Sequence, residues 1–591
     1  ASWSYSWLNV SAAAKAFAHR VLDPVASVAN NLVRKRGLIY ATEPADITSR
    51  AAKVTVIRQA TYGHHHSKWL NRAIKLAAQL NVEEMTWDEA ASVTSNKTAR
   101  SRVTGLTGRE VKAGHPTAVQ EVSRIVNALR DGDIPEPYDQ VTIMPKSEVF
   151  VRRRAKYSTK PPRIIAYPHL EMRFAEKLIL GKLAPAVAKA VCGEEYGFQY
   201  NPQQRVDRLV KMWRQKKTPA VFTSDIVCFD STITPADVDH ERLIYRSATK
   251  KDETKAAIDA LHRRLYAGGP MISQQGEHLG RRNCRASGVF TTSSSNTITA
   301  WLKVHAACDM AGIKSPSLLV CGDDVVCVFE STQDDASKMV LFAKAMASMG
   351  APLGATPKAL YDLELAEACS SNVTTIRYND KVDYILTRDP AIPFARCTAE
   401  GKGFNPEGAW IGNLVGYSRT LWSRVIAVQL METLINLEEI PKMVEMDWYG
   451  KKWNLPIADL PEIMQSLHGP NTWSKGYYTN REIQRVGAVL MELGMPKYRW
   501  YRLQARKLRS LAIRRGGVLK KLATYLLGFA AAVPVQPLDD KVVARYSDVN
   551  FHDHYDDKTI DAGDVEIRSS PKYWIPLISI LLISLIVLKF H

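Results

Sequence analysis

The clearest pattern of apolar and polar positions lies near the middle of the chain, where two apolar runs flank a short polar turn. Residues 318–321 and 325–328 are uniformly apolar, and Gly322, Asp323 and Asp324 stand between them. Short runs rich in valine and bounded by Gly and Asp predict the two strands of a β-hairpin. We therefore expect residues 317–328 to form a hairpin whose turn presents carboxylates.

Further strands and helices are predicted on both sides of this hairpin. Residues 220–228 form another β-rich segment, which carries Asp225, and residues 296–311 predict a helix. The run from Thr86 to Glu89 has the capping-box pattern that opens a helix. Weaker patterns predict strands at 141–144 and 164–166, mostly helical structure from 410 to about 529, and a hairpin at 446–455 with Trp448-Tyr449-Gly450-Lys451 at its tip.

The last part of the chain has a different character. Residues 534–572 are polar, acidic and contain proline, which is typical of a linker. Residues 573–588 are apolar apart from Ser579 and Ser584. As a helix they would span about 24 Å, against roughly 30 Å for the core of a bilayer. A buried helix is the alternative, but we expect a membrane anchor over residues 573–591, because nothing follows that could cover the helix.

Length and charge define the broad class of protein. With 591 residues the chain can form several packed subdomains, and 46% hydrophobic and 24% charged residues exclude wholesale disorder. A net charge of +19 predicts attraction to RNA, DNA or an acidic membrane face. The chain begins with Ala1 rather than Met, so we expect a product cut from a longer precursor, or a trimmed chain.

Cysteine and histidine usage argues against a structural zinc site. None of the eight cysteines forms a CxxC pair, and no set of Cys and His residues has the spacing of zinc ligands. We therefore expect reduced thiols in a cytosol-facing protein. The run His64-His65-His66 could bind a metal, but a solvated loop is the preferred interpretation.

Carboxylates on the predicted strands indicate a metal-dependent reaction. Joining a 3′-hydroxyl to a nucleotide α-phosphate requires one cation that activates the attacking oxygen. A second cation, about 3.5–4 Å away, stabilises the leaving pyrophosphate. Asp323 and Asp324 on the hairpin, with Asp225 on the preceding strand, could hold two such cations. A Gly-Asp-Asp turn alone also fits an ordinary surface turn.

A second group of polar residues could recognise the sugar of a nucleotide. Asp230 follows Asp225 by five residues and could accept a hydrogen bond from a ribose 2′-hydroxyl. Ser287, Thr292 and Asn296 follow at the start of a predicted helix and offer hydrogen-bonding groups for a ribose and a template backbone. A surface carboxylate pair and a plain helix N-cap are the alternatives.

A basic segment precedes both groups and contains Arg152, Arg153, Arg154, Lys156, Lys160 and Arg163. Such a loop can line a nucleotide channel and neutralise triphosphate charge, although a solvated charged loop has the same composition. The order of the segments is the order that a palm-type polymerase requires: basic loop, Asp225, Ser287-Gly288, then Gly322-Asp323-Asp324.

These four segments resemble motifs F, A, B and C of the RNA-dependent RNA polymerases of positive-strand RNA viruses. The closer match is to the hepacivirus group, which includes hepatitis C virus and GB virus B. It covers nearly the whole chain, with looser matches at residues 1–45 and 534–591. The further segments that carry it are Ala166-Tyr-Pro-His-Leu-Glu-Met-Arg173, Tyr196-Gly-Phe-Gln-Tyr200, Cys228-Phe-Asp-Ser-Thr-Ile-Thr234, Gly268-Gly-Pro-Met271, Ser370-Ser-Asn-Val373, Leu386-Thr-Arg-Asp-Pro390, Arg396-Cys-Thr-Ala-Glu-Gly401 and Leu467-His-Gly-Pro470.

The resemblance implies a multidomain α+β fold shaped as a right hand. Fingers, a palm with an antiparallel RRM-like sheet and a mostly helical thumb would encircle the active site. The implied divisions are fingers with fingertip loops at 1–193, palm at 194–231, fingers at 232–291, palm at 292–373, a thumb at 374–533 with a β-flap near 446–455, a linker at 534–572 and a membrane helix at 573–591.

The resemblance also implies roles for matching residues. Asp225, Asp323 and Asp324 would be catalytic and would hold two Mg²⁺ or Mn²⁺ ions. Asp230, Ser287, Thr292 and Asn296 would select the ribonucleotide. Arg50, Lys53, Lys146 and Arg163 would line the triphosphate path, and Arg388, Arg396 and Tyr449 would support initiation.

The implied function is RNA-directed replication of a positive-strand viral RNA genome, started without a primer. Implied partners are a single-stranded RNA template, nascent RNA, ribonucleoside triphosphates, a membrane through the C-terminal helix, and other viral replicase proteins. The expected location is a host membrane derived from the endoplasmic reticulum, with the catalytic domain in the cytosol and the C-terminus as a tail anchor.

Two other functions share parts of this pattern. A membrane-tethered RNA-binding scaffold with an inactive core would tolerate the loss of Asp225, Asp323 or Asp324, and all three are present. A reverse transcriptase or DNA polymerase would be expected to carry a bulky apolar residue in place of Asp230, to exclude the 2′-hydroxyl. Asp230 and Asn296 together therefore favour RNA synthesis.

Overall fold

The computed structural model describes residues 39–41, 54–56, 58–96, 98–146, 148–151, 162–378, 381–388, 412, 434–435, 442–448, 451–459, 477–478 and 498–522. The predicted site residues Arg50, Lys53, Arg396 and Tyr449 lie outside these ranges, as do most of the basic loop and the predicted linker and anchor. Among the helices in these ranges, none is both long and apolar enough to cross a bilayer.

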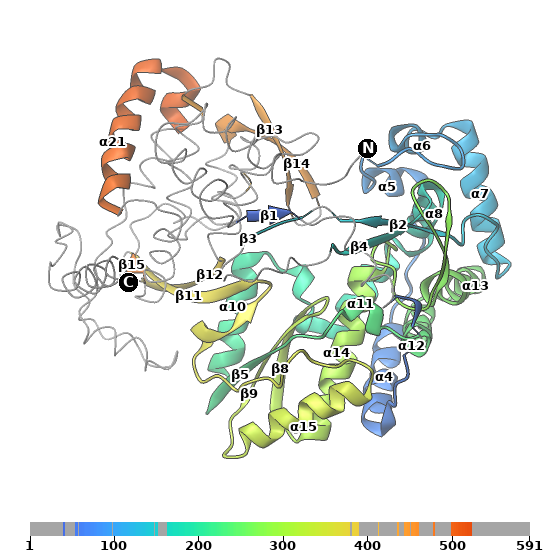
Figure 1. Ribbon diagram of the computed structural model, residues 1–591, viewed down its shortest axis with the longest axis horizontal. Helices are drawn as coiled ribbons and strands as arrows, with labels where there is room; N and C mark the ends of the chain where they lie inside the picture. The colour runs from blue at the N-terminus through green and yellow to red at the C-terminus, as the bar shows by residue number, and fades with distance from the viewer. Residues whose placement is uncertain are drawn as a thin grey trace, which may run out of the picture.

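A three-stranded antiparallel sheet positions the carboxylates. Its strands are β5 (Pro219–Ser224), β9 (Asp324–Glu330) and β8 (Lys314–Cys321), in the order β5-β9-β8 (Figure 1). Along β9, Val325 and Cys327 face one hydrophobic cluster, whereas Val326 and Val328 face another. Both faces are therefore buried, which explains why the hairpin strands are apolar at every position. The predicted hairpin is confirmed.

Helices cover both faces of this sheet. Helix α10 (Pro202–Arg214) packs on one face, and α14 (Thr292–Ala311) and α15 (Asp335–Ser348) lie on the other. The rings of Phe222 on β5 and Phe342 on α15 meet at a centroid distance of 4.8 Å. Burying a side chain of this size stabilises the fold by about 1.5–3 kcal/mol.

Helix α14 is the predicted helix of residues 296–311, but it starts at Thr292. Polar side chains are tolerated in its first turn because their hydroxyls find acceptors: Thr292 donates to the carbonyl of Ala286, and Ser294 to that of Thr291. The helix is buried on nearly all sides, against α15, α4 (Gly63–Ala78) and α9 (Leu183–Cys192). It is therefore the central helix of the described chain.

A second sheet joins segments that are far apart in the sequence. Strand β2 (Val141–Pro145) pairs antiparallel with β4 (Ile164–Pro168) and parallel with β6 (Gly269–Ile272), which pairs with β7 (His278–Arg282). The strands predicted at 141–144 and 164–166 are thus confirmed. The helices of this region are α5 (Trp87–Ser92), α6 (Gly108–Lys112), α7 (Pro116–Arg130), α8 (Leu170–Leu180), α12 (Pro235–Ser247) and α13 (Asp252–Leu261).

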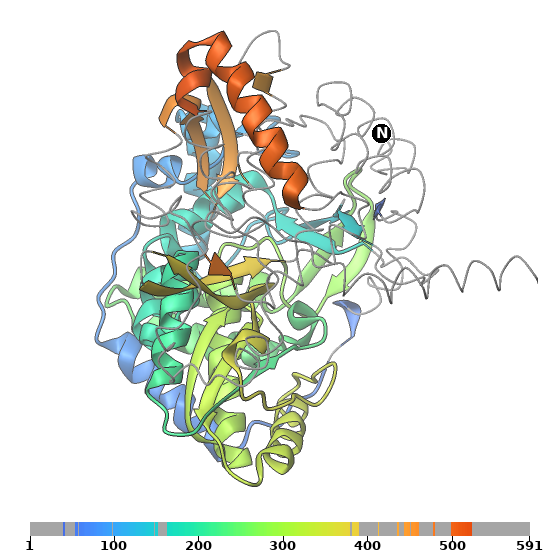
Figure 2. The same ribbon diagram turned by 90° about the vertical axis from the view of Figure 1, so that its left-hand side faces the viewer.

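The remaining strands lie in smaller sheets. Strands β10 (Glu367–Ala368), β11 (Ser371–Tyr378), β12 (Lys381–Arg388) and β15 (Tyr477–Tyr478) form one sheet, and β1 (Ile39–Ala41) pairs with β3 (Val149–Val151). Strands β13 (Met443–Trp448) and β14 (Lys451–Pro456) form the hairpin predicted at 446–455. This hairpin and α21 (Tyr498–Arg515) lie at the opposite end of the molecule from α15 (Figures 1 and 2).

Short helical turns complete the described elements: η3 (Gly193–Glu195), η4 (Gly197–Gln199), α11 (Phe229–Thr232), the π-helical turn η5 (His262–Tyr266), η6 (Leu363–Leu365) and η7 (Ile457–Asp459). Architecturally, the described chain is a mixture of helices and mostly antiparallel sheets, as the predicted α+β class requires.

Two local predictions have opposite outcomes. The capping box is confirmed, because the Thr86 hydroxyl accepts the N–H of Glu89 and the Glu89 carboxylate accepts the N–H of Thr86. The solvated loop at His64–His66 is wrong. These residues open helix α4, and His66 is buried between the rings of Tyr62 and His240, at centroid distances of 4.7 and 5.0 Å. Packing of α4 on α12 overrides the polar composition of the run.

Candidate active site

Asp225, Asp323 and Asp324 lie at one edge of the sheet β5-β9-β8. Ser224, the last residue of β5, pairs with Val325 of β9, so Asp225 and Asp324 stand at neighbouring strand ends. Asp225 directly follows β5 instead of lying on it, which corrects the prediction. The strand stops at Ser224 because the chain turns toward another segment, where Ile226 bridges to Leu353.

The three carboxylates are close enough to repel one another. Loss of hydration, followed by the negative charges of Asp323, Glu367 and Asp225, raises the pKa of Asp324 to about 6. Loss of hydration also raises the pKa of Asp323, and the charges of Asp230 and Asp225 add to the effect. Asp225, Asp323 and Asp324 nevertheless remain exposed to solvent. The sheet edge is therefore an accessible concentration of negative charge.

This donor set fits a divalent cation in its chemistry. Carboxylate oxygens are preferred ligands of Mg²⁺ and Mn²⁺, and a bound cation would relieve the repulsion that raises the pKa values of Asp323 and Asp324. Within the described ranges, however, no three His, Cys, Asp or Glu side chains converge closely enough to hold an ion as they stand. The three carboxylates lie at the same edge of the sheet, but they do not converge into a complete set of metal ligands.

Helix α14 holds the turn that carries Asp323 and Asp324. Gly322 has a φ of 63°, a left-handed conformation that favours glycine. Its N–H donates to the hydroxyl oxygen of Thr297 at 2.9 Å, and that hydroxyl donates to the carbonyl of Ser293 at 2.7 Å. Thr297 was not predicted as a site residue. The only feature of the sequence that could have indicated a role for Thr297 is its position directly after Asn296. Because the start of this helix contains many Ser and Thr residues, one more hydroxyl does not distinguish it.

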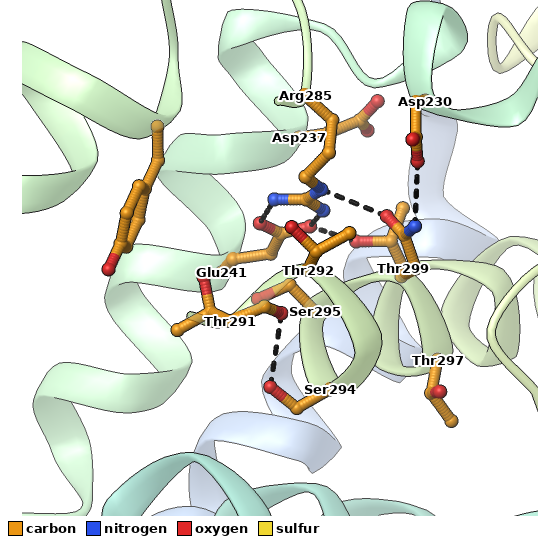
Figure 3. Close-up of polar contacts among 12 residues, drawn as sticks. Asp230, Asp237, Glu241, Arg285, Thr291, Thr292, Ser294, Ser295, Thr297 and Thr299 are labelled. Carbon is orange, nitrogen blue, oxygen red and sulfur yellow. Dashed lines mark hydrogen bonds and ion pairs between the residues drawn. The ribbon is translucent and has the colours of Figure 1, made fainter. Parts of the chain in front are cut away.

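Asp230 and Asn296 are in direct contact. The amide nitrogen of Asn296 donates to Oδ1 of Asp230 at 2.8 Å, and the Asn296 amide oxygen accepts from Nε of Arg285 at 2.9 Å (Figure 3). The other end of the Arg285 guanidinium pairs with Glu241, with 2.8 Å between Nη1 and Oε2. Arg285 and Glu241 were not predicted as site residues.

Ser287 and Thr292 hold the loop between β7 and α14. The hydroxyl oxygen of Ser287 accepts the N–H of Ala166 at 3.0 Å, and the Gly288 N–H donates to the Ala166 carbonyl at 2.7 Å. A side chain at Gly288 would collide, because its Cβ would lie 2.7 Å from the Ala166 oxygen. Thr292 donates to the carbonyl of Ala286 at 2.8 Å. Both hydroxyls are thus engaged within the protein.

Of the four basic residues predicted for the triphosphate path, Lys146 and Arg163 are described, and these two lie side by side. The N–H of Lys146 donates to the carbonyl of Arg163 at 2.8 Å, at the end of the β2-β4 pair. Both side chains approach Glu148, with nitrogen–oxygen distances of 3.1 Å for Lys146 and 3.5 Å for Arg163. The positive charge of Arg163 also lowers the pKa of Asp323, against the larger effects that raise it. Arg163 therefore lies within electrostatic reach of the carboxylates.

The residues predicted for initiation are described only in part. Arg388 is the last residue of β12 and pairs with Ser371 of β11, in a different sheet from the carboxylates. Arg396 and Tyr449 lie outside the described ranges. The hairpin that carries Tyr449 is described up to its last pair, Trp448 with Lys451.

Comparison with known proteins shows the family. A family model described as viral RNA-dependent RNA polymerase matches residues 8–514. The genome polyprotein of Hepatitis GB virus B is 43% identical over 592 residues, which cover 99% of this chain and 20% of that protein. The genome polyprotein of Hepatitis C virus genotype 3k (isolate JK049) is 39% identical over 534 residues, covering 90% of this chain and 18% of that protein.

These relatives confirm the resemblance to hepaciviruses that the motifs indicated. This chain spans only about a fifth of the length of the polyproteins that it matches. The family model, in contrast, covers most of the chain, from before the first described strand to the last turn of α21. The chain therefore belongs to the viral RNA-dependent RNA polymerases.

Proposed function

We propose that this protein replicates a positive-strand viral RNA genome by template-directed nucleotidyl transfer that uses two metal ions. The observation that carries the proposal is the arrangement of Asp225, Asp323 and Asp324. They come from segments about a hundred residues apart, share one sheet edge, and are close enough for their charges to raise the pKa values of Asp323 and Asp324. A sheet edge with this chemistry is what two-metal phosphoryl transfer requires.

Asp225, Asp323 and Asp324 are the residues that would hold the Mg²⁺ or Mn²⁺ ions. Bound ions of this kind activate the attacking 3′-oxygen and stabilise the leaving pyrophosphate. Arg163 and Lys146 would bind the triphosphate of the incoming nucleotide. Because both side chains approach Glu148, phosphate oxygens would replace that carboxylate as their partner.

The pair of Asp230 and Asn296 supports selection of ribonucleotides. Asn296 engages Oδ1 of Asp230 and thereby orients the carboxylate. The second oxygen can then accept a hydrogen bond from a ribose 2′-hydroxyl, which a deoxyribonucleotide lacks. Ser287 and Thr292 would contribute to the same selection. The hydroxyl oxygen of Ser287 already accepts the N–H of Ala166, so Ser287 would act as a donor through its hydroxyl proton.

The sheets of the described chain support the right-hand architecture. Residues 141–145, 164–168, 269–272 and 278–282 share one sheet, while residues 219–224, 314–321 and 324–330 share another. This arrangement fits a fingers domain built from two stretches of the chain, with a palm segment between them in the sequence. The hairpin β13-β14 would be the flap near 446–455 and, with Arg388, Arg396 and Tyr449, would support initiation without a primer.

A primer-free assay tests the polymerase proposal. The full chain is incubated with an RNA template of defined 3′ end, the four ribonucleoside triphosphates, and Mg²⁺ or Mn²⁺. We expect full-length product that is lost when the metal is chelated and is not formed from deoxyribonucleoside triphosphates. RNA binding without synthesis under all metal conditions would favour the scaffold alternative, and synthesis from deoxyribonucleotides would favour the DNA polymerase alternative.

We also propose that residues 573–591 anchor the protein in a host endoplasmic-reticulum-derived membrane, with the catalytic domain in the cytosol beside other viral replicase proteins. The apolar composition of residues 573–588 supports this. Deletion of residues 571–591 should release the protein from membranes in a flotation assay and leave RNA synthesis intact. A deleted protein that still floats with membranes, or that cannot polymerise, would contradict the anchor proposal.

A further inference from the structure

Asn296 can face Asp230 in two ways, and only one of them provides a hydrogen bond. The Nδ2 group donates to a carboxylate, whereas the amide oxygen would repel it. Arg285 decides between the two orientations. Its Nε–H can only donate, so the Asn296 atom at 2.9 Å from it must be the oxygen, and the Nδ2 group is directed to Asp230.

Arg285 is itself held without freedom to rotate. Its side chain is fully buried, and its two terminal nitrogens donate to the two oxygens of Glu241, which is also fully buried. Thr299 on α14 donates to Oε1 of Glu241 at 2.5 Å. Every buried polar atom of the Arg285, Glu241 and Asn296 side chains has a partner within the described residues. Figure 3 labels Arg285, Glu241, Thr299 and Asp230, which belong to this chain of contacts.

The loop around Arg285 also positions the backbone of Asp230. The Arg285 N–H donates to the Asp230 carbonyl at 3.2 Å. Burial alone would lower the pKa of Arg285, but the attraction of Glu241 raises this pKa above its ordinary value. The guanidinium is therefore charged at every working pH. One residue therefore fixes both the main chain of Asp230 and the amide that orients its carboxylate.

Stability alone does not account for this pair. A buried ion pair gains little over apolar side chains of similar volume, because taking both charges out of water offsets their attraction. What apolar side chains cannot supply is the directed Nε–H donor. This points to a role in orienting the site.

We propose that Arg285, locked by Glu241, is a positioning residue that determines ribose specificity by fixing the orientation of Asn296 and Asp230. This inference rests on the proposed polymerase function. Without the Arg285 donor, Asn296 is held at one end only and can rotate together with the Asp230 carboxylate, which is then no longer fixed toward the 2′-hydroxyl. A ribonucleotide then loses a hydrogen bond that a deoxyribonucleotide never makes.

The decisive variant is Arg285→Lys. A lysine ammonium can pair with Glu241, but it has no second donor at the Nε position to hold Asn296. Single-nucleotide incorporation is measured on an RNA template with a ribonucleoside triphosphate and with its 2′-deoxy analogue, in parallel with thermal unfolding. We expect kcat/KM for the ribonucleotide to fall about tenfold while the value for the deoxynucleotide stays within about twofold.

Arg282 provides a matched control. It is equally buried and lies three residues earlier, but its guanidinium donates to the backbone carbonyls of Leu265 and Cys284. Arg282→Lys should lower the unfolding temperature and reduce incorporation of both nucleotides in proportion, without changing their ratio. A change of ratio in this variant equal to that in Arg285→Lys would overturn the inference, because any buried arginine would then produce it.

A double variant covers the case in which Arg285→Lys does not fold. Arg285→Met with Glu241→Leu removes both charges, keeps the volume, and should fold. We again expect a loss confined to the ribonucleotide. If either folded variant keeps the wild-type discrimination, or loses both substrates equally, the inference is wrong while the polymerase function stands. If the wild-type protein incorporates no ribonucleotide, the proposed function fails and the inference fails with it.

Discussion

The hydroxyl oxygen of Thr297 accepts the backbone N–H of Gly322 at 2.9 Å, while its neighbour Asn296 donates to Asp230. Successive helix residues point about 100° apart, so two adjacent side chains of α14 reach two different partners. One partner is the turn that carries Asp323, and the other is the carboxylate proposed to recognise ribose. A single turn of α14 thus fixes the two halves of the site relative to each other.

Removing the Thr297 hydroxyl should loosen the carboxylate turn. In Thr297→Val the Gly322 N–H loses its acceptor in a buried position, which should lower the free energy of unfolding by about 1–2 kcal/mol. Because Asp323 follows Gly322 directly, kcat should fall by about tenfold. Nucleotide incorporation and urea unfolding measure the two effects. Thr297→Ser keeps the hydroxyl and should retain most activity; an equal loss in both variants would contradict this role.

Neutralising Asp323 should separate catalysis from RNA binding. Asp323→Asn removes a proposed metal ligand, so nucleotide incorporation should become undetectable, at least about a thousandfold below wild type. RNA binding, measured by fluorescence anisotropy, should persist because it depends on the basic surface of the protein. Asp131→Asn, at an exposed position after α7, is the control and should behave as wild type. Loss of RNA binding together with activity in Asp323→Asn would instead indicate a folding role.

Activity should depend on pH through Asp324. Its pKa of about 6 lies above the ordinary value of 3.8, so a part of the molecules carries a protonated carboxyl at mildly acidic pH. A protonated carboxyl is a poor metal ligand, and we expect kcat/KM to fall as the pH drops through about 6. Protons and the cation compete for the same oxygens, so a tenfold increase in Mg²⁺ should move the midpoint to lower pH.

Glu367 offers an independent check of this assignment. It follows Asp323 among the charges that raise the pKa of Asp324, so Glu367→Gln should move the acid midpoint down by about 0.5 unit. Glu253→Gln, on the exposed surface of α13, should leave the midpoint unchanged. A midpoint that responds neither to Mg²⁺ nor to Glu367→Gln would show that another group limits activity.

The elements that the sequence predicted well are those marked by a short apolar run between turn residues. The hairpin of β8 and β9 follows from the two apolar runs around Gly322, and the strands β2 and β4 follow from similar short runs. The carboxylates of the site were identified because a metal-dependent reaction requires that residue type at strand ends. Their assembly at one edge of a sheet then follows from the pairing of β5 with β9.

The contacts that the sequence did not reveal depend on tertiary packing. Glu241 and Arg285 are 44 residues apart and would each be expected at the surface, since isolated charged side chains are rarely buried. The fold buries both by placing α12 against α14. His66 was misassigned for a similar reason, because a polar run carries no sign that α12 will cover it. The end of β5 at Ser224 depends on a bridge from Ile226 to Leu353, which local sequence does not encode.

The proposed catalytic carboxylates should cost the folded protein stability. A folded-state pKa above the ordinary value means that folding favours the protonated form of Asp324. Protonation of Asp324 therefore stabilises the folded protein. This stabilisation is complete below about pH 4 and is lost as the pH rises through about 6. Asp324→Asn should consequently increase the free energy of unfolding at pH 7 without metal. After discounting for solvent screening of this exposed group, the gain should not exceed about 1 kcal/mol.

The pH dependence of this gain separates electrostatic repulsion from a packing effect. At pH 4 the wild-type Asp324 is already largely protonated, so wild type and Asp324→Asn should unfold at nearly the same urea concentration. Adding Mg²⁺ at pH 7 should stabilise the wild type more than the variant, because the cation relieves the repulsion only where the carboxylates can bind it. A variant that is more stable by the same amount at pH 4 and pH 7, and equally responsive to Mg²⁺, would show that charge repulsion is not the cause. In that case charge repulsion would no longer support a metal site at this edge of the sheet.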